Sequence, residues 1–304
     1  MTKWTSETMP SQLGRSAIVT GTGGLGYETS LALARAGARV VIAGRNPDKG
    51  AAAVTAVQAE VPGARVRFGE VNLASLSSIA AFAARMEDEQ DSLDLLINNA
   101  GVMTPPKRRE TADGFELQMG TNYLSHFALT ARLMPLLRKG KKPRVVTLGS
   151  VAARTGAIHF DDLQSQQGYH PFTAYAQSKL ACIMFAFELS RRSLSAGWGV
   201  ESLAAHPGIT RTDLIFNGAG KASLHGFMRR QLWFLFQPVW QGALPTLYAA
   251  TDPAAQTGGY YGPDRLAGTR GYPTAEAPPV KAEDLAVAAR LWDVSETLTN
   301  VRFA

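Results

Sequence analysis

The chain has 304 residues, of which 45% are hydrophobic and 18% are charged, so it can bury a large core. Its net charge of +6 comes from scattered basic residues and not from a basic stripe with interleaved aromatic residues, which excludes a nucleic-acid-binding class. The one cysteine, Cys182, excludes an intramolecular disulfide, favours a reducing compartment and is expected to be a small buried side chain.

The start of the sequence and its apolar runs indicate where the protein resides. The stretch MTKWTSETMP is polar and lacks the apolar centre of a signal peptide. No apolar run approaches the roughly 18 residues needed to cross a bilayer. We therefore expect a cytoplasmic protein without a transmembrane segment. His159, His170 and His225 lack the spacing of metal ligands, so no metal is predicted.

The first predicted unit is a strand, a glycine-rich turn, a helix and a second strand. Residues 15–20 and 39–43 are apolar runs typical of buried strands, and residues 27–36 have a helical pattern. The turn, Gly21-Thr22-Gly23-Gly24-Leu25-Gly26, matches G-x-G-x-x-G between a strand and a helix. Glycines let main-chain N–H groups approach a pyrophosphate at the helix start, so the unit predicts dinucleotide binding. The cofactor contacts predicted in this turn are Gly21, Thr22, Gly24, Leu25 and Gly26.

The end of the second strand indicates which dinucleotide binds. A carboxylate at this point would accept a hydrogen bond from the ribose 2′-hydroxyl of NAD. The chain has Gly44-Arg45-Asn46 instead, with no carboxylate before Asp48. A guanidinium suits a 2′-phosphate, so Arg45 and Asn46 favour NADP(H) over NAD(H).

Strand and helix patterns continue to alternate along the chain. The further predicted helices cover residues 47–60, 75–90, 111–137 and 173–195, and the further strands cover 65–71, 93–97, 144–148 and 200–205. This alternation predicts an α/β fold, a doubly wound parallel sheet with helices on both faces. Ligands of such sheets bind at the carboxyl ends of the strands, so the glycine turn, Asn99, Ser150 and Pro207-Gly208 should line one crevice.

Tyr175 and Lys179 lie four residues apart in the predicted helix 173–195. This spacing places both side chains on one helix face, about one turn apart. A lysine ammonium stabilises a neighbouring phenolate, and such a phenol can exchange a proton with a carbonyl oxygen or an alcohol. A surface helix can carry the same pair by chance. The pair therefore indicates a catalytic site only together with the other motifs of the chain.

Together these motifs resemble the short-chain dehydrogenase/reductase family. The shared features, in chain order, are the glycine turn, Asn98-Asn99-Ala100-Gly101, Asn122, Ser150, Tyr175-x-x-x-Lys179 and Pro207-Gly208. The retinol dehydrogenase-like branch is the most similar. Its marks in this chain are Asp113-Gly114-Phe115, Phe160-Asp161-Asp162-Leu163, His206-Pro207-Gly208, Gly259-Tyr260-Tyr261-Gly262-Pro263 and Leu291-Trp292.

The resemblance implies a single-domain Rossmann fold with a helical substrate lid, and a role for each matching residue. Tyr175 would be the general acid in reduction and the base in oxidation, and Lys179 would bond the nicotinamide ribose. Ser150 would bond the reacting carbonyl, and Asn122 would hold a water that links Lys179 to solvent. Further cofactor contacts would come from Asn99, Ala100, Gly101, Pro207, Gly208, Ile209, Thr210 and Thr212.

The chain departs from the family pattern at two places that bear on the cofactor. The glycine turn is one residue shorter than the usual Thr-Gly-x-x-x-Gly-x-Gly, which removes a side chain that often helps to hold phosphate. Asn72, followed by Leu73, stands where an aspartate commonly meets the adenine. Asparagine can both donate and accept, so Asn72 and Leu73 stay among the predicted cofactor contacts.

The segment 211–241 is rich in large apolar residues and is expected to form the lid over a bulky hydrophobic substrate. The alternatives for this segment are ordinary core helix, a subunit interface and docking at a membrane surface. The single domain, residues 1–304, would then consist of a cofactor-binding and catalytic core at 12–210, the lid, and C-terminal helices with a last strand at 242–304.

These inferences predict an NADP(H)-dependent oxidoreductase that interconverts a bulky hydrophobic ketone or aldehyde and its alcohol, as a homodimer or homotetramer. The alternative is a non-catalytic NADP(H)-binding sensor or scaffold that has lost turnover through its shorter glycine turn. An enoyl reductase of the same family would place its tyrosine seven residues before the lysine. That position holds Phe172, so this activity is set aside.

Overall fold

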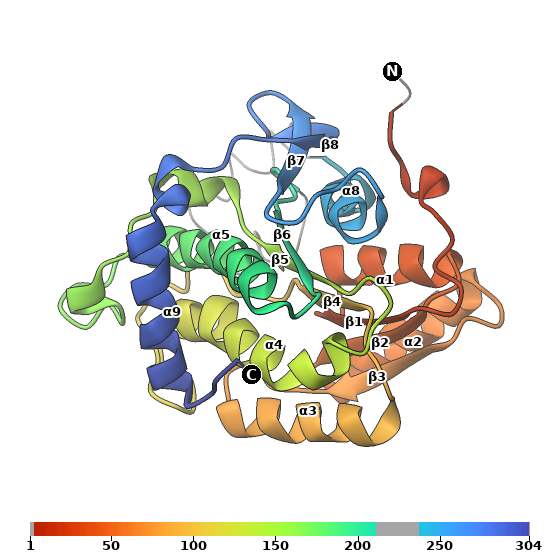
Figure 1. Ribbon diagram of the computed structural model, residues 1–304, viewed down its shortest axis with the longest axis horizontal. Helices are drawn as coiled ribbons and strands as arrows, with labels where there is room; N and C mark the ends of the chain where they lie inside the picture. Colours follow the sequence, from red (N-terminus) through yellow and green to blue (C-terminus); the bar gives the residue numbers. More distant parts are fainter. Residues whose placement is uncertain (1–2, 211–236, 304) are drawn as a thin grey trace.

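The computed structural model describes residues 3–210 and 237–303, which form a sheet with helices on both of its faces (Figure 1). The eight strands of the sheet lie in the order β3-β2-β1-β4-β5-β6-β7-β8. Neighbouring strands are parallel except for β8, which pairs antiparallel with β7. The predicted doubly wound parallel sheet is therefore confirmed.

The strands and helices follow the predicted alternation, with small shifts at their ends. The strands are β1 (Ser16–Thr20), β2 (Arg39–Gly44), β3 (Val66–Glu70), β4 (Leu95–Asn98), β5 (Arg144–Leu148), β6 (Glu201–Ala205), β7 (Tyr260–Arg265) and β8 (Arg270–Ala275). The α-helices are α1 (Leu25–Arg35), α2 (Pro47–Glu60), α3 (Leu76–Glu89), α4 (Ser125–Leu137), α5 (Pro171–Ala196), α8 (Val239–Thr251) and α9 (Leu285–Thr299). The short helical turns are η1 (Ser6–Thr8), η2 (Met119–Leu124, a π-helix), η3 (Val151–Thr155), η4 (Phe160–Asp162) and η6 (Val280–Glu283).

Residues 111–116 form a turn and an isolated bridge, although the pattern predicts a helix there, so this part of the prediction is wrong. Gly114 has a φ of 82°, a left-handed conformation that a continuous helix does not contain. Glu116 follows, and its buried carboxylate accepts hydrogen bonds from the N–H groups of Gln118 and Met119 at 3.0 and 2.7 Å. The helical region therefore begins only after Glu116, whose carboxylate satisfies two of its first donors.

The C-terminal part holds two strands where one is predicted. The chain reverses after β7 through Leu266 and Ala267, which have φ values of 50° and 53°, and Gly268, with a φ of 76°. This turn brings β8 back along β7 as an antiparallel partner at the edge of the sheet.

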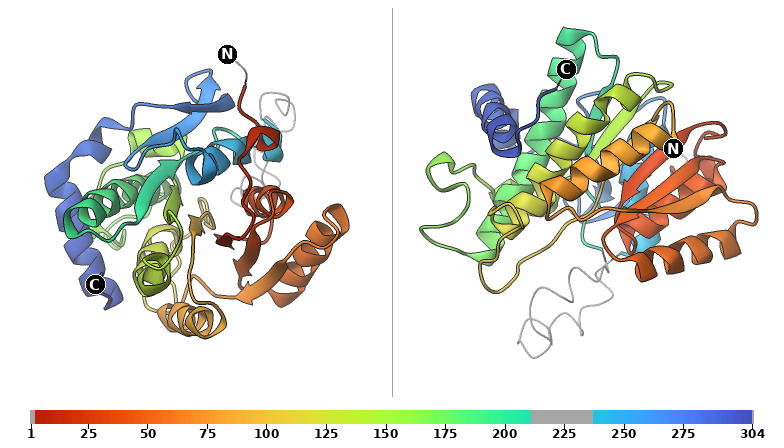
Figure 2. Two further views of the ribbon diagram at one scale, coloured as in Figure 1. Left: turned by 45° about the vertical axis from the view of Figure 1, so that its right-hand side comes forward. Right: turned by 90° about the horizontal axis from the view of Figure 1, so that it is seen from below.

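The helices divide between the two faces of the sheet (Figures 1 and 2). Helices α3, α4 and α5 cover one face, and α1, α2 and α8 cover the other. Successive residues of β1 point to opposite faces: Ile18 belongs to the core under α3–α5, whereas Ala17 and Val19 belong to the core under α1 and α8. The two cores hold the strands rigidly, so their carboxyl ends form a fixed edge.

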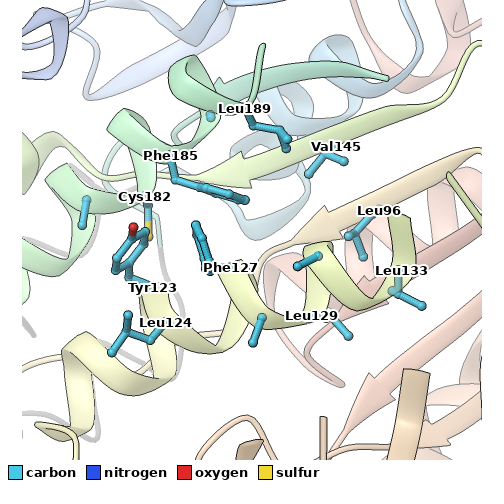
Figure 3. Close-up of a cluster of buried hydrophobic side chains, with 14 of the residues drawn as sticks. Leu96, Tyr123, Leu124, Phe127, Leu129, Leu133, Val145, Cys182, Phe185 and Leu189 are labelled. Atoms are coloured by element: carbon cyan, nitrogen blue, oxygen red, sulfur yellow. The ribbon is translucent and has the colours of Figure 1, made fainter. Parts of the chain in front are cut away.

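The C-terminal segment completes the core beside α4 and α5 with aromatic side chains. The ring of Trp292 on α9 lies 5.0 Å from the ring of Phe127 on α4 and 5.9 Å from that of Phe185 on α5. Phe303 lies 5.1 Å from Phe127 and 4.4 Å from Trp292, again between ring centroids. Figure 3 shows Phe127 and Phe185 facing each other, close to Tyr123. Such aromatic pairs stabilise a core beyond the area that they bury, so they hold α9 to this layer.

Some features are absent from the described ranges 3–210 and 237–303. No helix in these ranges has the length and apolar character needed to cross a membrane. Nor do these ranges contain a group of three or more His, Cys, Asp or Glu side chains placed to hold a metal ion.

Candidate active site

A cavity of about 330 Å³ lies at the carboxyl edge of the sheet. It lies beside the residues that follow β1, β4, β5 and β6, where parallel sheets of this kind bind ligands. The predicted site residues that line it are Leu25, Asn99, Gly101, Ser150, Tyr175, Lys179, Pro207, Gly208, Ile209 and Thr210. Segments far apart in the chain thus meet in one crevice.

Helix α5 carries Tyr175 and Lys179, and its start is well defined. His170 is the N-cap, with its ring Nδ1 accepting from the N–H of Thr173 at 3.4 Å, and Pro171 occupies the first helical position. The helix therefore begins one turn before Tyr175. The half-buried Tyr175 and the buried Lys179 then reach the same cavity from one face of the helix.

The ammonium group of Lys179 is held at the end of β5. Only 6% of this residue is exposed, and its Nζ donates to the main-chain oxygen of Leu148 at 2.9 Å. A Cβ added at Gly101 would lie 3.7 Å from the same Nζ, so the segment after β4 also passes close to it. A buried ammonium is costly unless it has polar partners. This position therefore gives the cavity a fixed positive charge.

Ser150 lies just beyond β5, where the chain leaves the sheet. It is the N-cap of η3, and its Oγ accepts from the N–H of Ala152 at 3.2 Å. The hydroxyl hydrogen remains available for a donated hydrogen bond, because a hydroxyl has one donor and two acceptor positions. Ser150 is thus a strand-end cap and a potential donor in the cavity.

Asn122 lies in the π-helical turn η2, and protein atoms occupy its side-chain amide. Its Oδ1 accepts from Val102 N–H at 2.7 Å, while its Nδ2 donates to Val102 O at 3.0 Å and to Ser178 Oγ at 2.9 Å. The main-chain oxygen of Asn122 also has protein partners, since His126 Nδ1 and Cys182 Sγ approach it at 2.9 and 3.1 Å. The water held by Asn122 stays a prediction. The side chain itself joins the segment after β4 to α5.

His126 and Cys182 beneath the cavity are both uncharged at neutral pH. Burial lowers the pKa of His126 to about 4; the hydrogen bond to the Asn122 carbonyl raises that pKa, and the charge of Lys179 lowers it. Because that carbonyl can only accept, His126 carries its proton on Nδ1, and its Nε2 faces Thr20 Oγ1 at 3.0 Å. Burial raises the pKa of the Cys182 thiol, as expected for a structural cysteine.

The glycine turn joins β1 to α1 with close main-chain packing. Gly21 has a φ of 107°, and a Cβ added at Gly26 would lie 2.4 Å from the main-chain oxygen of Gly21. A Cβ at Gly23, by contrast, would meet no atom within 4 Å. The N-cap of α1 is Gly24, which has no side chain to accept from the first N–H groups of the helix. A dinucleotide pyrophosphate fits this cradle, because those donors need an acceptor and the outer side of the turn is open.

The residues predicted to contact the adenosine half lie along the same edge, outside the 330 Å³ cavity. Arg45, directly after β2, is exposed, and Asn46 caps α2 by accepting from Lys49 N–H at 2.8 Å. The side-chain oxygen of Asn72 accepts from the N–H of Ala74 at 3.1 Å. Its side-chain NH₂ group is therefore the part that could bond an adenine.

The remaining predicted contacts lie in two tight segments. Asn99 donates from Nδ2 to Thr20 O at 2.6 Å, and the N–H groups of Asn99 and Ala100 both donate to Thr20 Oγ1 at 2.9 Å. Gln237 donates to Pro207 O and forms an isolated bridge with Thr210. Leu73 is buried with 9% exposure. Thr212, and the lid predicted at 211–241 as far as residue 236, lie outside the described residues.

Several residues that line the cavity are missing from the sequence-based set. All are neighbours of predicted residues: Val102 and Met103 after Gly101, Leu148 and Gly149 before Ser150, Val151 and Ala152 after it, and Phe172 near Tyr175. Phe172 precedes Tyr175 by three residues, a helical spacing that could have indicated it. Leu148 ends β5, and Val151 and Ala152 begin the short turn η3. Val102, Met103 and Gly149 belong to loops, whose side chains have no period from which to predict their direction.

The sequence is similar to those of known dehydrogenases. The family profile described as short chain dehydrogenase matches residues 15–219. A protein of Mus musculus named polyprenol dehydrogenase is 41% identical over 299 residues, which cover 96% of this chain and 86% of the relative. Retinol dehydrogenase 13 of Mus musculus is 38% identical over 296 residues, covering 96% of this chain and 85% of the relative.

Solved structures give a consistent comparison. An uncharacterized protein from Mycobacterium paratuberculosis superimposes with a TM-score of 0.82 at 38% identity, covering 100% of both chains. The NADP complex of RhlG from Pseudomonas aeruginosa has a TM-score of 0.66 at 24% identity, covering 82% of this chain and 94% of the other. The second likeness concerns the fold alone.

Proposed function

Because the chain belongs to the short-chain dehydrogenase/reductase family, in its retinol dehydrogenase-like branch, we propose an NADP(H)-dependent oxidoreductase that interconverts a bulky apolar ketone or aldehyde and its alcohol. One observation carries the proposal: Ser150, Tyr175 and Lys179 line a single cavity with the end of the glycine turn. The family is one of oxidoreductases. The cofactor preference and the substrate class are our inference.

In the proposed mechanism, the protein positions the carbonyl and moves one proton. The nicotinamide, when bound, supplies the hydride in reduction or accepts it in oxidation. Ser150 donates a hydrogen bond to the carbonyl oxygen, and Tyr175 gives that oxygen a proton; in oxidation Tyr175 takes the proton back. Lys179 stabilises the phenolate with its buried positive charge and bonds the nicotinamide ribose. Asn122 fixes Val102 to α5 and so shapes the wall beside Lys179.

The apolar lining and the relatives support a bulky apolar substrate. Val102, Met103, Val151, Ala152 and Phe172 supply much of the surface around the polar groups. Two relatives are named for retinol and polyprenol, which are both apolar alcohols. Residues 211–241 complete the proposal as a substrate lid between a core at 12–210 and a C-terminal part at 242–304.

The proposal is tested by mixing the protein with a panel of aryl ketones and aldehydes and with NADPH or NADH. We expect NADPH oxidation, followed at its absorbance band, with at least one bulky carbonyl compound and slower turnover with NADH. Tight NADPH binding with no turnover on any compound would instead support the binding-only sensor or scaffold.

The cofactor preference has its own test at the end of β2. Arg45 is exposed there and is proposed to pair with the 2′-phosphate of NADPH. Arg45→Glu should raise the KM for NADPH by about 10- to 100-fold, because a charge-assisted bond is lost and a like charge is added. The KM for NADH should change little.

The matched control is Arg39→Glu. Arg39 is the first residue of the same strand and is also exposed. It lies at the amino end of β2, whereas Arg45 follows the carboxyl end. Arg39→Glu changes the net charge by the same amount as Arg45→Glu, but away from the proposed 2′-phosphate site. It should therefore leave both KM values unchanged. An equal loss of NADPH affinity in both variants would show a general charge effect and contradict the assignment of Arg45.

A cytoplasmic location and a homodimer or homotetramer complete the proposal. The use of a single cysteine, the buried Cys182, favours a reducing compartment.

A further inference from the structure

Two apolar side chains flank the catalytic groups in the cavity. Met103 lies in the segment after β4, and Phe172 lies in the first turn of α5; both line the same cavity as Ser150 and Tyr175. Phe172 is 48% exposed, so it offers apolar surface that a ligand can cover. We call Met103 and Phe172 the two walls.

Gln118, whose side chain is buried, bonds the chain neighbours of both walls. Its Oε1 accepts from the main-chain N–H of Thr104 at 2.7 Å, and Thr104 directly follows Met103. Its Nε2 donates to the main-chain oxygen of Pro171 at 3.0 Å, and Pro171 directly precedes Phe172. The residue is 0% exposed, so its amide group depends on these protein partners. One amide group therefore connects the two segments.

Tyr169 adds a second connection between the same segments. Gln118 Nε2 also donates to Tyr169 Oη at 3.1 Å, and this hydroxyl donates to the main-chain oxygen of Pro105 at 2.9 Å. Both amide hydrogens of Gln118 are thus used. The bridge runs from residues 104–105 to residues 169–171 through part-buried hydrogen bonds.

The backbone at Thr104 indicates that this bridge does more than satisfy polar groups. Thr104 has a φ of 46°, a left-handed conformation that β-branched residues rarely adopt. Such conformations persist only where the surroundings enforce them, and they cluster at functional sites. The hydrogen bond from Thr104 N–H to Gln118 is a contact of this kind, directly beside Met103.

We propose that Gln118 is a positioning residue that sets the separation of the walls Met103 and Phe172 and thereby makes the site selective for bulky apolar carbonyl compounds. This inference rests on the proposed function and specifies how its substrate is chosen. Gln118 itself does not line the cavity, whereas Met103 and Phe172 both do. It therefore acts through these two walls.

The test uses Gln118→Met, which keeps the length of the side chain and removes its hydrogen bonds. The ratio of kcat/KM for a diaryl ketone to that for propanal is expected to fall about tenfold, mainly through KM for the ketone. Phe172→Ala should lower the same ratio. The double variant should fall by less than the product of the two single effects, since part of the effect of Gln118 passes through Phe172. Should Gln118→Met fail to fold, Tyr169→Phe removes one link of the bridge and should lower the ratio in the same direction.

The matched control is Gln177→Met. Gln177 is 3% exposed and bonds His159 N–H at 2.8 Å and Leu163 O at 3.2 Å, so it ties residues 159–163 to α5 without bonding the chain neighbours of either wall. Gln177→Met is expected to lower the free energy of unfolding without changing the ratio of the two kcat/KM values. An equal fall of the ratio in both glutamine variants would show a general loosening and overturn the proposal.

Two further results separate this inference from the proposed function. Turnover with an unchanged ratio in Gln118→Met and Phe172→Ala would overturn the inference alone. If the wild-type protein shows no turnover, binding of the diaryl ketone by ligand-observed NMR is the readout. Weaker binding in both variants would support the walls, and unchanged or absent binding would overturn them.

Discussion

Replacing Tyr175 by phenylalanine is expected to lower kcat by about 10²- to 10⁴-fold, the usual contribution of a positioned general acid or base. The substitution removes one oxygen from a half-buried side chain that shares its cavity with Ser150 and Lys179. The ring stays, so packing and cofactor affinity should be retained. The measurement is kcat on the best aryl ketone of the panel, with the NADPH dissociation constant from fluorescence.

Tyr248→Phe is the control for this experiment. Tyr248 is a half-buried tyrosine on α8, where it packs against Trp4 and Tyr261, outside the cavity. Its loss of one hydroxyl should leave kcat unchanged. Turnover by Tyr175→Phe at the wild-type rate would contradict the assigned proton transfer, whatever the substrate.

Gly26→Ala should damage both the fold and the cofactor site. The added Cβ would lie 2.4 Å from the main-chain oxygen of Gly21 and 2.8 Å from Asn99 Nδ2, well inside contact distance. Main-chain atoms cannot move aside as a flexible side chain can, so α1 must shift away from the turn. We expect the free energy of unfolding to fall by about 1–3 kcal/mol, and kcat/KM to fall about 100-fold because the cofactor is displaced. Denaturant unfolding and NADPH titration measure the two effects.

The paired substitution is Gly23→Ala, in the same turn. A Cβ at Gly23 meets no atom within 4 Å, so stability should be unchanged. NADPH affinity should nevertheless fall, because the methyl group would occupy the open side of the turn where the pyrophosphate is proposed to bind. If Gly26→Ala has the same denaturation midpoint as the wild-type protein, Gly26 and Gly21 do not pack as closely as the structure shows.

The parts of the site that the sequence predicts are those fixed by local chain geometry. The glycine turn follows a strand and opens a helix, and the spacing of Tyr175 and Lys179 is a property of any α-helix. Ser150 and Asn99 follow buried strands, so the parallel sheet places them at one edge. These features depend on period and order alone, and the structure reproduces them.

Other features depend on tertiary contacts, which leave no periodic pattern in the sequence. The engagement of the Asn122 amide with Val102 joins residues 20 positions apart, and it changes how a water could be held. The turn at 111–116 replaces a predicted helix, because Gly114 has a positive φ and the carboxylate of Glu116 caps the helical region that follows. The connection between Met103 and Phe172 depends on the hydrogen bonds of Gln118, which join segments far apart in the chain.

The aromatic contacts of α9 also constrain the order in which the molecule is completed. Phe127 and Phe185 leave the ribosome more than 100 residues before Trp292 and Phe303, which pack against them. During translation the nascent chain therefore presents an uncovered aromatic face until α9 follows, the kind of surface on which holdase chaperones act. Closure of that face must wait for α9, whereas β1, β2 and β3 can already pair with one another.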